Sequence, residues 1–293
     1  MSFFKPQRVM FFFVTALALL FLAANSVLCK LAFFNQGIDP FSFSAIRLIS
    51  GAITLLLCVS LFSKTSFSWH NYAIKKTQFI SSGLLFLYAI AFSYSYVLID
   101  TGVGALILFG TVQIAMIAYA LLTKQNVGVF KIIGGGIALF GLGYLLLPTS
   151  SSSVSLKGAL LMALAGLTWA FYSIIGKNTQ HPLLSTSYNF SYSVLFVVLF
   201  ALVSFPQIHL SAQSFLYAII SGSLTSGIGY VLWYMVVTKI ETSTASIIQL
   251  IVPVLATVGG VVLLDEALTL HIVIASTIIL SGIALLALQK EKR

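Results

Sequence analysis

Charged residues are scarce in this sequence: 15 Lys and Arg and 6 Asp and Glu make up 7% of 293 residues. A soluble globular domain carries about 25% charged residues, so the chain has too few charges to cover a water-facing surface. The composition therefore excludes a soluble enzyme. It also excludes a disordered chain, because 24 Phe and 12 Tyr are too many apolar groups for a solvated coil.

Groups that bind metals or perform catalysis are also few. The 2 cysteines, Cys29 and Cys58, lie in or beside apolar runs without metal-binding spacing, and we interpret them as small buried hydrophobic residues. The 4 histidines fall in loops or at helix ends and form no cluster that could hold iron. No nucleophile is paired with a buried base. We therefore expect no enzyme activity, no catalytic residue, no metal and no cofactor.

Long apolar runs dominate what is present, and the mean hydropathy is +1.08. Runs of about 20 residues are typical of membrane-spanning helices, whereas a β-barrel would show short alternating strands. The first run follows Lys5 and Arg8 as in a signal peptide, but we interpret it as an uncleaved helix. The sequence predicts an all-α integral membrane protein with ten transmembrane helices. They lie at about 9–29, 41–62, 77–98, 103–122, 128–147, 158–176, 185–205, 213–236, 244–264 and 270–288.

The basic residues fall mainly on one side of such a bundle. With the N-terminus in the cytoplasm, only Lys30, Arg47 and Lys157 lie toward the outside. The other twelve lie at cytoplasmic ends: Lys5, Arg8, Lys64, Lys75, Lys76, Lys124, Lys131, Lys177, Lys239, Lys290, Lys292 and Arg293. This positive-inside bias predicts an even number of spans, with both termini cytoplasmic, in a bacterial inner membrane. The net charge of +9 is therefore explained by the orientation of the protein in the lipid bilayer, and it does not indicate nucleic-acid binding.

The chain from position 80 onward aligns without gaps with the chain from position 220 onward, at an offset of 140 residues. Ile80-Ser81 matches Ile220-Ser221, Tyr94 matches Tyr234, and Gln113 falls on Pro253. Five spans in each half is an odd number, so the second half would enter the membrane from the opposite side. The sequence therefore predicts two inverted-topology five-helix repeats, 8–147 and 157–288, as in secondary transporters.

Several stretches carry a family resemblance that covers nearly the whole chain. They are Asn25-Ser26-Val27 with Lys30, Asp39-Pro40-Phe41, Arg47, Tyr94 to Ala105, Leu167 to Ala170, Tyr230 to Tyr234, and Thr244 through Pro253 to Glu266. In their order and duplication they resemble the EamA-type ten-helix members of the drug/metabolite transporter superfamily. The resemblance implies a central cavity lined mainly by the first, third, fourth, sixth, eighth and ninth helices. The chain departs from the family pattern at Gln113, where a Pro is usual, and at Asn126, near the family's Glu.

The six acidic residues all fall in loops, at helix ends or in the C-terminal tail: Asp39, Asp100, Glu241, Asp265, Glu266 and Glu291. Proton-coupled pumps commonly carry a carboxylate near a helix centre. The placement of the six acidic residues of this chain argues against a mechanism that uses a membrane Glu. It leaves a facilitator, an exchanger, or proton coupling through other groups.

Candidate site residues are the amides, aromatics and hydroxyls at mid-depth. The predicted substrate-binding residues are Asn25, Ser26, Tyr94, Gln113, Trp169, Tyr230, Trp233 and Gln249, and the predicted gating residues are Arg47 and Pro253. Each has a structural alternative: an interhelical hydrogen bond for the amides, packing or an interface belt for the aromatics, and close packing for the Pro253 kink. For Arg47 the functional interpretation is an anion contact or a gate in the outer half, and the alternative is a side chain that extends to the outer interface.

These features favour a secondary transporter that works by alternating access on a small neutral or zwitterionic metabolite, such as an amino acid, with export as the expected direction. Scarce positive charge at mid-depth argues against a phosphorylated substrate. We expect a monomer or homodimer with proton or exchange coupling. Two alternatives stay open: a membrane subunit or receptor without transport, and a flippase for a lipid-linked substrate.

Overall fold

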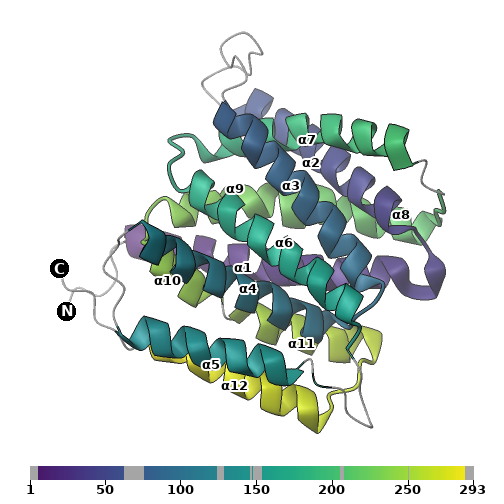
Figure 1. Ribbon diagram of the computed structural model, residues 1–293. Helices are drawn as coiled ribbons and strands as arrows, with labels where there is room; N and C mark the ends of the chain where they lie inside the picture. The colour runs from purple at the N-terminus through teal and green to yellow at the C-terminus, as the bar shows by residue number, and fades with distance from the viewer. Residues whose placement is uncertain are drawn as a thin grey trace.

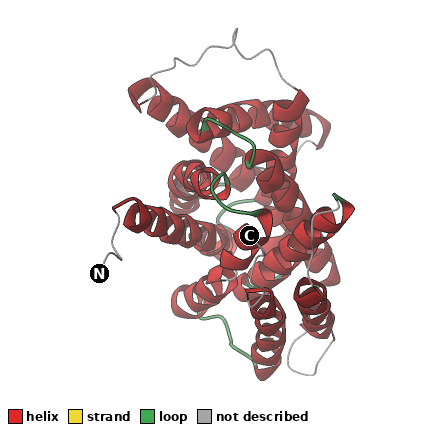
Figure 2. Ribbon diagram, turned by 90° about the vertical axis from the view of Figure 1, so that its left-hand side faces the viewer, coloured by secondary structure: helices red, strands yellow, loops and turns green. Residues whose placement is uncertain are grey.

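The computed structural model describes residues 6–62, 76–123, 129–145, 147, 154–204, 208–249 and 251–287. Helices joined by short connections make up these residues (Figure 2). The elements are α1 (Pro6–Phe33), η1 (Phe34–Gln36), α2 (Pro40–Phe62), α3 (Lys76–Tyr96), α4 (Thr101–Leu122), α5 (Val129–Leu145), α6 (Leu156–Gly176), α7 (Pro182–Ser204), α8 (Ala212–Ile220), η2 (Ser221–Ile228), α9 (Gly229–Val237), α10 (Thr242–Ile248), α11 (Ile251–Leu264) and α12 (Leu270–Ala287).

Seven of the described helical stretches are long and apolar enough to cross a membrane, and three shorter ones are apolar too. The prediction of an all-helical membrane protein is confirmed at this level. Two of the segments that the sequence predicts as single helices are divided into several elements in the structure. The segment 213–236 is α8, η2 and α9, of which η2 is a π-helix, and the segment 244–264 is divided into α10 and α11.

Local sequence explains where several helices begin. Asp39 precedes α2 and accepts a hydrogen bond from the Ser42 backbone N–H at 2.8 Å, and Pro40 occupies the first helical position, where its missing N–H has no cost. Ser155 and Ser211 cap α6 and α8 in the same way, through the N–H groups of Gly158 and Ser214. The polar residues near these helix ends therefore fix the helix boundaries.

The helices pack around α1, which contacts α3, α4, η2, α8, α9 and α11. On one side α2 packs against α7 and η2, and α3 packs against α6 and α7. On the other side α5 and α12 lie together along the lower edge of the bundle in Figure 1. The centre of the molecule therefore lies where α1, α2, α3, α6 and α9 meet.

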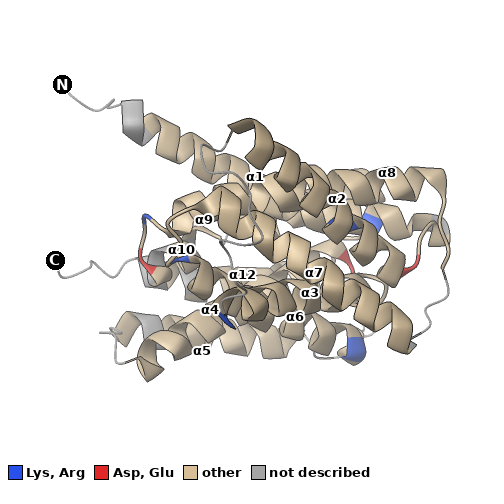
Figure 3. Ribbon diagram, turned by 90° about the horizontal axis from the view of Figure 1, so that it is seen from above, with Lys and Arg blue, Asp and Glu red and all other residues tan. Residues whose placement is uncertain are grey.

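Charge is nearly absent from the helix bodies, as Figure 3 shows. Large apolar side chains such as Phe12, Leu61 and Val203 are instead exposed on the outer faces. Contiguous exposed apolar surface of this kind matches a lipid environment rather than water. Among the basic residues used to predict orientation, Lys5, Lys64, Lys75, Lys124, Lys290, Lys292 and Arg293 lie outside the described residues, as does Asn126.

Candidate functional site

Polar and aromatic side chains meet in the centre of the bundle in a group that we call the central cluster. Its members are Asn25 on α1, Arg47 on α2, Tyr88 and Phe92 on α3, Trp169 and Tyr172 on α6, Ser226 on η2, Tyr230 on α9, and Gln249 after α10. Each of these side chains is less than 5% exposed. A buried group of this polarity is expensive in a membrane unless its members bond to one another or to a ligand.

Arg47 is the charged member of the cluster. Its Nε donates to Ser226 Oγ at 2.7 Å, and its Nη2 donates to Tyr230 Oη at 2.6 Å. The guanidinium carbon lies 5.3 Å from the ring centroid of Tyr88 and 5.0 Å from that of Phe92, which are cation–π distances. With 1% exposure, Arg47 points into the protein, so the alternative in which it extends to the outer interface is wrong.

Asn25 joins α1 to the π-helix η2. Its Oδ1 accepts hydrogen bonds from Ser221 Oγ at 2.9 Å, Thr225 Oγ1 at 2.6 Å and Ser226 Oγ at 3.0 Å. Its Nδ2 donates to the Thr225 carbonyl at 3.2 Å. Because Ser226 also accepts from Arg47, a continuous hydrogen-bond path runs from α2 through η2 to α1.

The aromatic rings form a contiguous wall beside Arg47. The Trp169 centroid lies 4.6 Å from that of Tyr230 and 5.2 Å from that of Tyr88. Its Nε1 donates to Gln249 Oε1 at 3.0 Å, and Gln249 Nε2 donates to the Ala245 carbonyl at 3.1 Å. Trp169 on α6 and Gln249 at the end of α10, each predicted as a site residue, are therefore in direct contact.

Pro253 accounts for the interruption between α10 and α11. Proline has no N–H, so the Gln249 carbonyl, four residues earlier, cannot receive the usual helical bond. The Val252 N–H donates to that carbonyl instead, at 3.0 Å. The helix is therefore broken beside Gln249, which places this amide at an irregular point of the backbone.

A second polar patch lies alongside the cluster on α6, α7 and α9. Trp233 Nε1 donates to Ser173 Oγ at 3.1 Å, and Tyr234 Oη donates to the Tyr172 carbonyl at 3.1 Å. Asn189 Nδ2 donates to Tyr172 Oη at 3.4 Å. Trp233, a predicted site residue, thus contacts α6 through Ser173.

The predicted residues are placed as follows. The structure brings Asn25, Arg47, Trp169, Tyr230 and Gln249 together in the central cluster. Ser26 and Gln113 are 2% exposed on α1 and α4, and Pro253 is buried in α11. Tyr94 is half-buried. It follows Phe92 by two residues, which on a helix turns it away from the face that carries Tyr88 and Phe92.

Tyr88, Phe92, Ser226 and Asn189 were not among the predicted site residues. A signal exists for two of them, because Tyr88, Phe92 and Tyr96 recur at every fourth position and so form one aromatic stripe of α3. Ser226 lies in a run of small polar residues that offers no way to select one hydroxyl. Asn189 lies one and a half turns into an apolar segment, where an amide is a recognisable signal.

Five buried side-chain atoms have no hydrogen-bond partner among the described residues: Nη1 of Arg47, Oε1 of Gln78 and of Gln113, Oδ1 of Asn189 and Oγ of Ser191. Arg47 lies in the central cluster, and Asn189 bonds its member Tyr172. The acidic side chains are engaged elsewhere: Asp39 with backbone N–H groups of Ser42 and His209, and Glu266 with Thr101. No described carboxylate lies within ion-pair distance of Arg47, so the cluster has an uncompensated positive charge.

The outer end of the bundle, as the sequence orients it, is tied together by long-range contacts. Lys30 Nζ donates to the Tyr96 and Ile99 carbonyls at 3.1 and 2.7 Å, which joins α1 to the end of α3. Glu266 accepts from the Thr101 N–H at 2.8 Å and from Thr101 Oγ1 at 2.6 Å, which joins the α11–α12 loop to the start of α4. These contacts hold α1, α3, α4 and the α11–α12 loop together at this end of the bundle.

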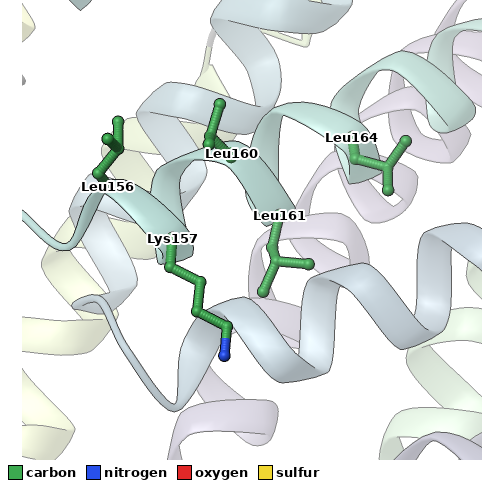
Figure 4. A pocket seen from close by; sticks show the side chains of 5 residues that line it. All are labelled: Leu156, Lys157, Leu160, Leu161 and Leu164. Atoms are coloured by element: carbon green, nitrogen blue, oxygen red, sulfur yellow. The ribbon is translucent and has the colours of Figure 1, made fainter.

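A groove lies outside this site, on the surface of α6. It has a volume of about 460 Å³ and is lined by Leu156, Lys157, Leu160, Leu161 and Leu164, as Figure 4 shows. Leu156 and Leu160 are more than 60% exposed. The groove is therefore an apolar outer surface and not an entrance to the central cluster. Among the described residues, no group of three or more His, Cys, Asp and Glu side chains could hold a metal.

Comparisons with known proteins point in one direction. The model of the EamA-like transporter family matches residues 156–288. An uncharacterized protein of Pseudomonas aeruginosa is 38% identical over 273 residues, with 93% of each chain covered. The uncharacterized transporter YoaV of Bacillus subtilis is 25% identical over 264 residues, covering 85% of this chain and 87% of the relative. An uncharacterized transporter of Archaeoglobus fulgidus is 23% identical over 285 residues, covering 92% and 94%.

One solved crystal structure shares the fold. It superimposes with a TM-score of 0.70 at 17% sequence identity, and the match covers 94% of this chain and 96% of that chain. The agreement in fold extends over both halves of the sequence.

Proposed function

The chain belongs to the EamA-like transporter family of the drug/metabolite transporter superfamily, and from this premise we propose that it carries a small neutral or zwitterionic organic metabolite across the membrane by alternating access. The family is one of multi-pass membrane transporters rather than enzymes. Beyond family membership, we propose the substrate class, the direction of transport and the mechanism.

Support for alternating access comes from the way in which the helices pair. In the proposed repeats, α1, α2, α3, α4 and α5 correspond in order to α6, α7, α8–α9, α10–α11 and α12. When each helix is replaced by its counterpart, the main pairs of helices in contact stay the same. The contact of α3 with α6 corresponds to that of α8 and α9 with α1, and the contact of α4 with α6 corresponds to that of α11 with α1. The pairs α2 with α7 and α5 with α12 correspond to themselves. This pattern favours the inverted repeats 8–147 and 157–288 as the two moving units.

The observation that carries the proposal is the central cluster itself. Arg47 and Tyr88 come from the first half, and Trp169, Tyr230 and Gln249 come from the second, so the cluster lies where the halves meet. Substrate sites of inverted-repeat transporters lie at such junctions, beside interrupted helices. The α10–α11 break at Gln249 and Pro253 supplies that feature, and we assign Pro253 a gating role.

The chemistry of the cluster supports the substrate class. Aromatic rings and amides suit a small molecule with an apolar body and polar groups, and a single cation does not suit a multiply charged phosphate ester. We place the protein in a bacterial inner membrane with both termini cytoplasmic, and export is the proposed direction. Proton or exchange coupling, and a monomer or homodimer, complete the proposal.

Flux measurements on purified protein in lipid vesicles test this function. A panel of radiolabelled amino acids and related metabolites is measured with and without a proton gradient, and in exchange mode with internal substrate. We expect saturable uptake of at least one compound, absent from protein-free vesicles. Absence of flux for the whole panel in all three modes, from a folded protein, would favour the non-transporting subunit. Flux of lipid-linked compounds alone would favour the flippase.

A further inference from the structure

Arg47 has a charge that the protein leaves unbalanced. Its five N–H donors comprise one on Nε, which bonds Ser226, and four on the two terminal nitrogens. Nη2 bonds Tyr230 at 2.6 Å and approaches Tyr88 Oη at 3.5 Å. Nη1 has no partner among the described residues, although it is buried. Two donors on one nitrogen of a buried guanidinium are therefore unused.

The neighbours of Arg47 can orient it but do not neutralise it. Its bonded partners are hydroxyl groups, which are neutral acceptors, and a cation–π contact such as those to Tyr88 and Phe92 is worth about 2 kcal/mol or more when desolvated. A lone charge in a medium of low dielectric costs much more than this unless an opposite charge accompanies it. The missing partner is an anion.

The surroundings select among anions. In this arrangement the guanidinium is 1% exposed, so an anion reaches it only when the bundle opens. A phosphate ester, with up to two charges, would need several cations, and Arg47 is the only Lys or Arg in the central cluster. A carboxylate has one charge, which Arg47 alone can balance, and its oxygens can accept hydrogen bonds from Nη1. Tyr88 lies over the guanidinium, Tyr230 bonds it, and Trp169 packs against both rings, so aromatic surface adjoins this anion position.

We propose that Arg47 binds the carboxylate group of the transported substrate through its unused Nη1 donors, with Ser226 and Tyr230 holding the guanidinium in place. This inference rests on the transport function proposed above and deepens it by changing the substrate class: it keeps zwitterions that carry a carboxylate, such as amino acids, and adds small monocarboxylate anions. Purely neutral metabolites are excluded. Arg47 then recognises substrate, in place of the gating role expected from its sequence position.

Ligand binding to the purified full-length protein tests the inference. Isothermal titration calorimetry measures binding, because the chain has 3 Trp and its fluorescence would not report on Trp169 alone. The probes are the twenty standard L-amino acids and acetate, each compared with the amide in which an uncharged group replaces the carboxylate. Chloride is titrated separately, since a small inorganic ion could occupy the same donors. The variants are Arg47→Gln, Arg47→Lys and, as a matched control, Lys157→Gln, which removes a cation from the exposed surface of α6.

We expect at least one carboxylate to bind the wild type about 10- to 100-fold more tightly than its amide, the range of a charge-assisted hydrogen bond. Arg47→Gln should weaken the carboxylate by that factor and leave the amide unchanged. Arg47→Lys, which keeps the charge without the planar guanidinium, should bind the carboxylate with an affinity between those of the wild type and Arg47→Gln. Lys157→Gln should bind it as the wild type does. If Arg47→Gln does not fold, the inference is tested by the ratio of carboxylate affinity to amide affinity in Arg47→Lys.

Three results would overturn the inference: an unchanged ratio in the Arg47 variants, equal binding of amides and carboxylates to the wild type, or a response to chloride with none to any carboxylate. Vesicle flux separates this inference from the transport proposal. Carboxylate binding without flux removes the transport function and retains the anion site. Flux of a neutral metabolite that does not depend on Arg47 retains transport and removes the carboxylate assignment.

Discussion

Trp169 and Gln249 illustrate how single residues build the central cluster. The indole N–H and the amide oxygen bond each other at 3.0 Å, and the other end of the amide bonds the Ala245 carbonyl. Gln249 thus links the aromatic wall to the broken helix pair α10–α11. Removal of either group leaves a buried polar atom unpaired, which costs about 1–3 kcal/mol.

The variant Gln249→Ala should therefore lower the initial transport rate about tenfold or more, while the protein still reaches the membrane. Trp169→Phe, which keeps a ring and removes the N–H, should show a smaller loss of the same kind. Flux into vesicles and quantification of protein in the membrane measure the two quantities. Gln213→Ala is the matched control, because this exposed amide bonds only Tyr217 in the structure described. Normal flux in both cluster variants would remove Trp169 and Gln249 from the site.

At this scale the sequence was informative where polarity is conspicuous. An amide in an apolar segment stands out, so Asn25, Gln113 and Gln249 could be named, although their partners could not. Ser226 could not be selected, because four hydroxyl residues occur between positions 221 and 226 with no basis for a ranking. Which of them faces Arg47 depends on how the π-helix turns. Contacts between helices distant in sequence set these roles.

Among the elements, η2 departs most from what the sequence predicts. An ordinary helix was expected over 213–236, and residues Ser221–Ile228 form a π-helix instead. Wider π turns are common at functional sites and leave backbone groups differently placed. Here Asn25 supplies side-chain bonds to three hydroxyls of η2, an interaction that no periodicity reveals. The break between α10 and α11, by contrast, follows from Pro253 and could be expected.

Close backbone contact between α2 and η2 depends on Gly222. A methyl group on this residue would meet Ser50 Oγ and the Arg47 carbonyl. Gly222→Ala should therefore push η2 away from α2 and destabilise the protein by about 1–3 kcal/mol, with reduced transport because Arg47 moves as well. Thermal unfolding in detergent and vesicle flux measure the two effects.

Gly136→Ala is the control for this variant, since nothing lies within 4 Å of the added methyl group in α5. It should be neutral or stabilise by about 0.4–1 kcal/mol, as glycine-to-alanine changes do in an unstrained helix. Equal loss of stability in the two variants would show that the contact of η2 with α2 has no special role.

For the whole molecule, we predict the orientation in the membrane from charge. If Lys177 and Lys239 are cytoplasmic, Asn178 lies inside, and α7 then carries the chain across to Ile208 outside. In a background without native cysteines, Asn178→Cys should react with a membrane-impermeant maleimide only after the cells are opened. Ile208→Cys, at a position 73% exposed, should react on intact cells. The reverse pattern would overturn the orientation.

How the bundle opens is also a property of the whole molecule. Glu266 holds the end of α11 against the start of α4 through two bonds to Thr101. Gly259, on the same helix, packs against Val27 of α1, so that α11 covers the face of α1 that carries Val27. Val27 is 8% exposed in this arrangement. Loosening of the outer contact should therefore expose a cysteine placed at this position.

In a background without native cysteines that carries Val27→Cys, Glu266→Gln should raise the rate at which an external maleimide labels the introduced thiol, by about tenfold. The reason is that a bond between a carboxylate and an N–H or O–H at a helix start is worth about 1.5–3 kcal/mol, and its loss shifts the closed-to-open ratio by that amount. Asp265→Asn provides the control: it removes the same charge from the neighbouring exposed residue, for which the structure records no hydrogen bond. Equal labelling in both variants would mean that Glu266 does not hold the outer end closed. Faster labelling in Glu266→Gln alone would mean that the loop of one half controls access to the first helix of the other, as alternating access requires.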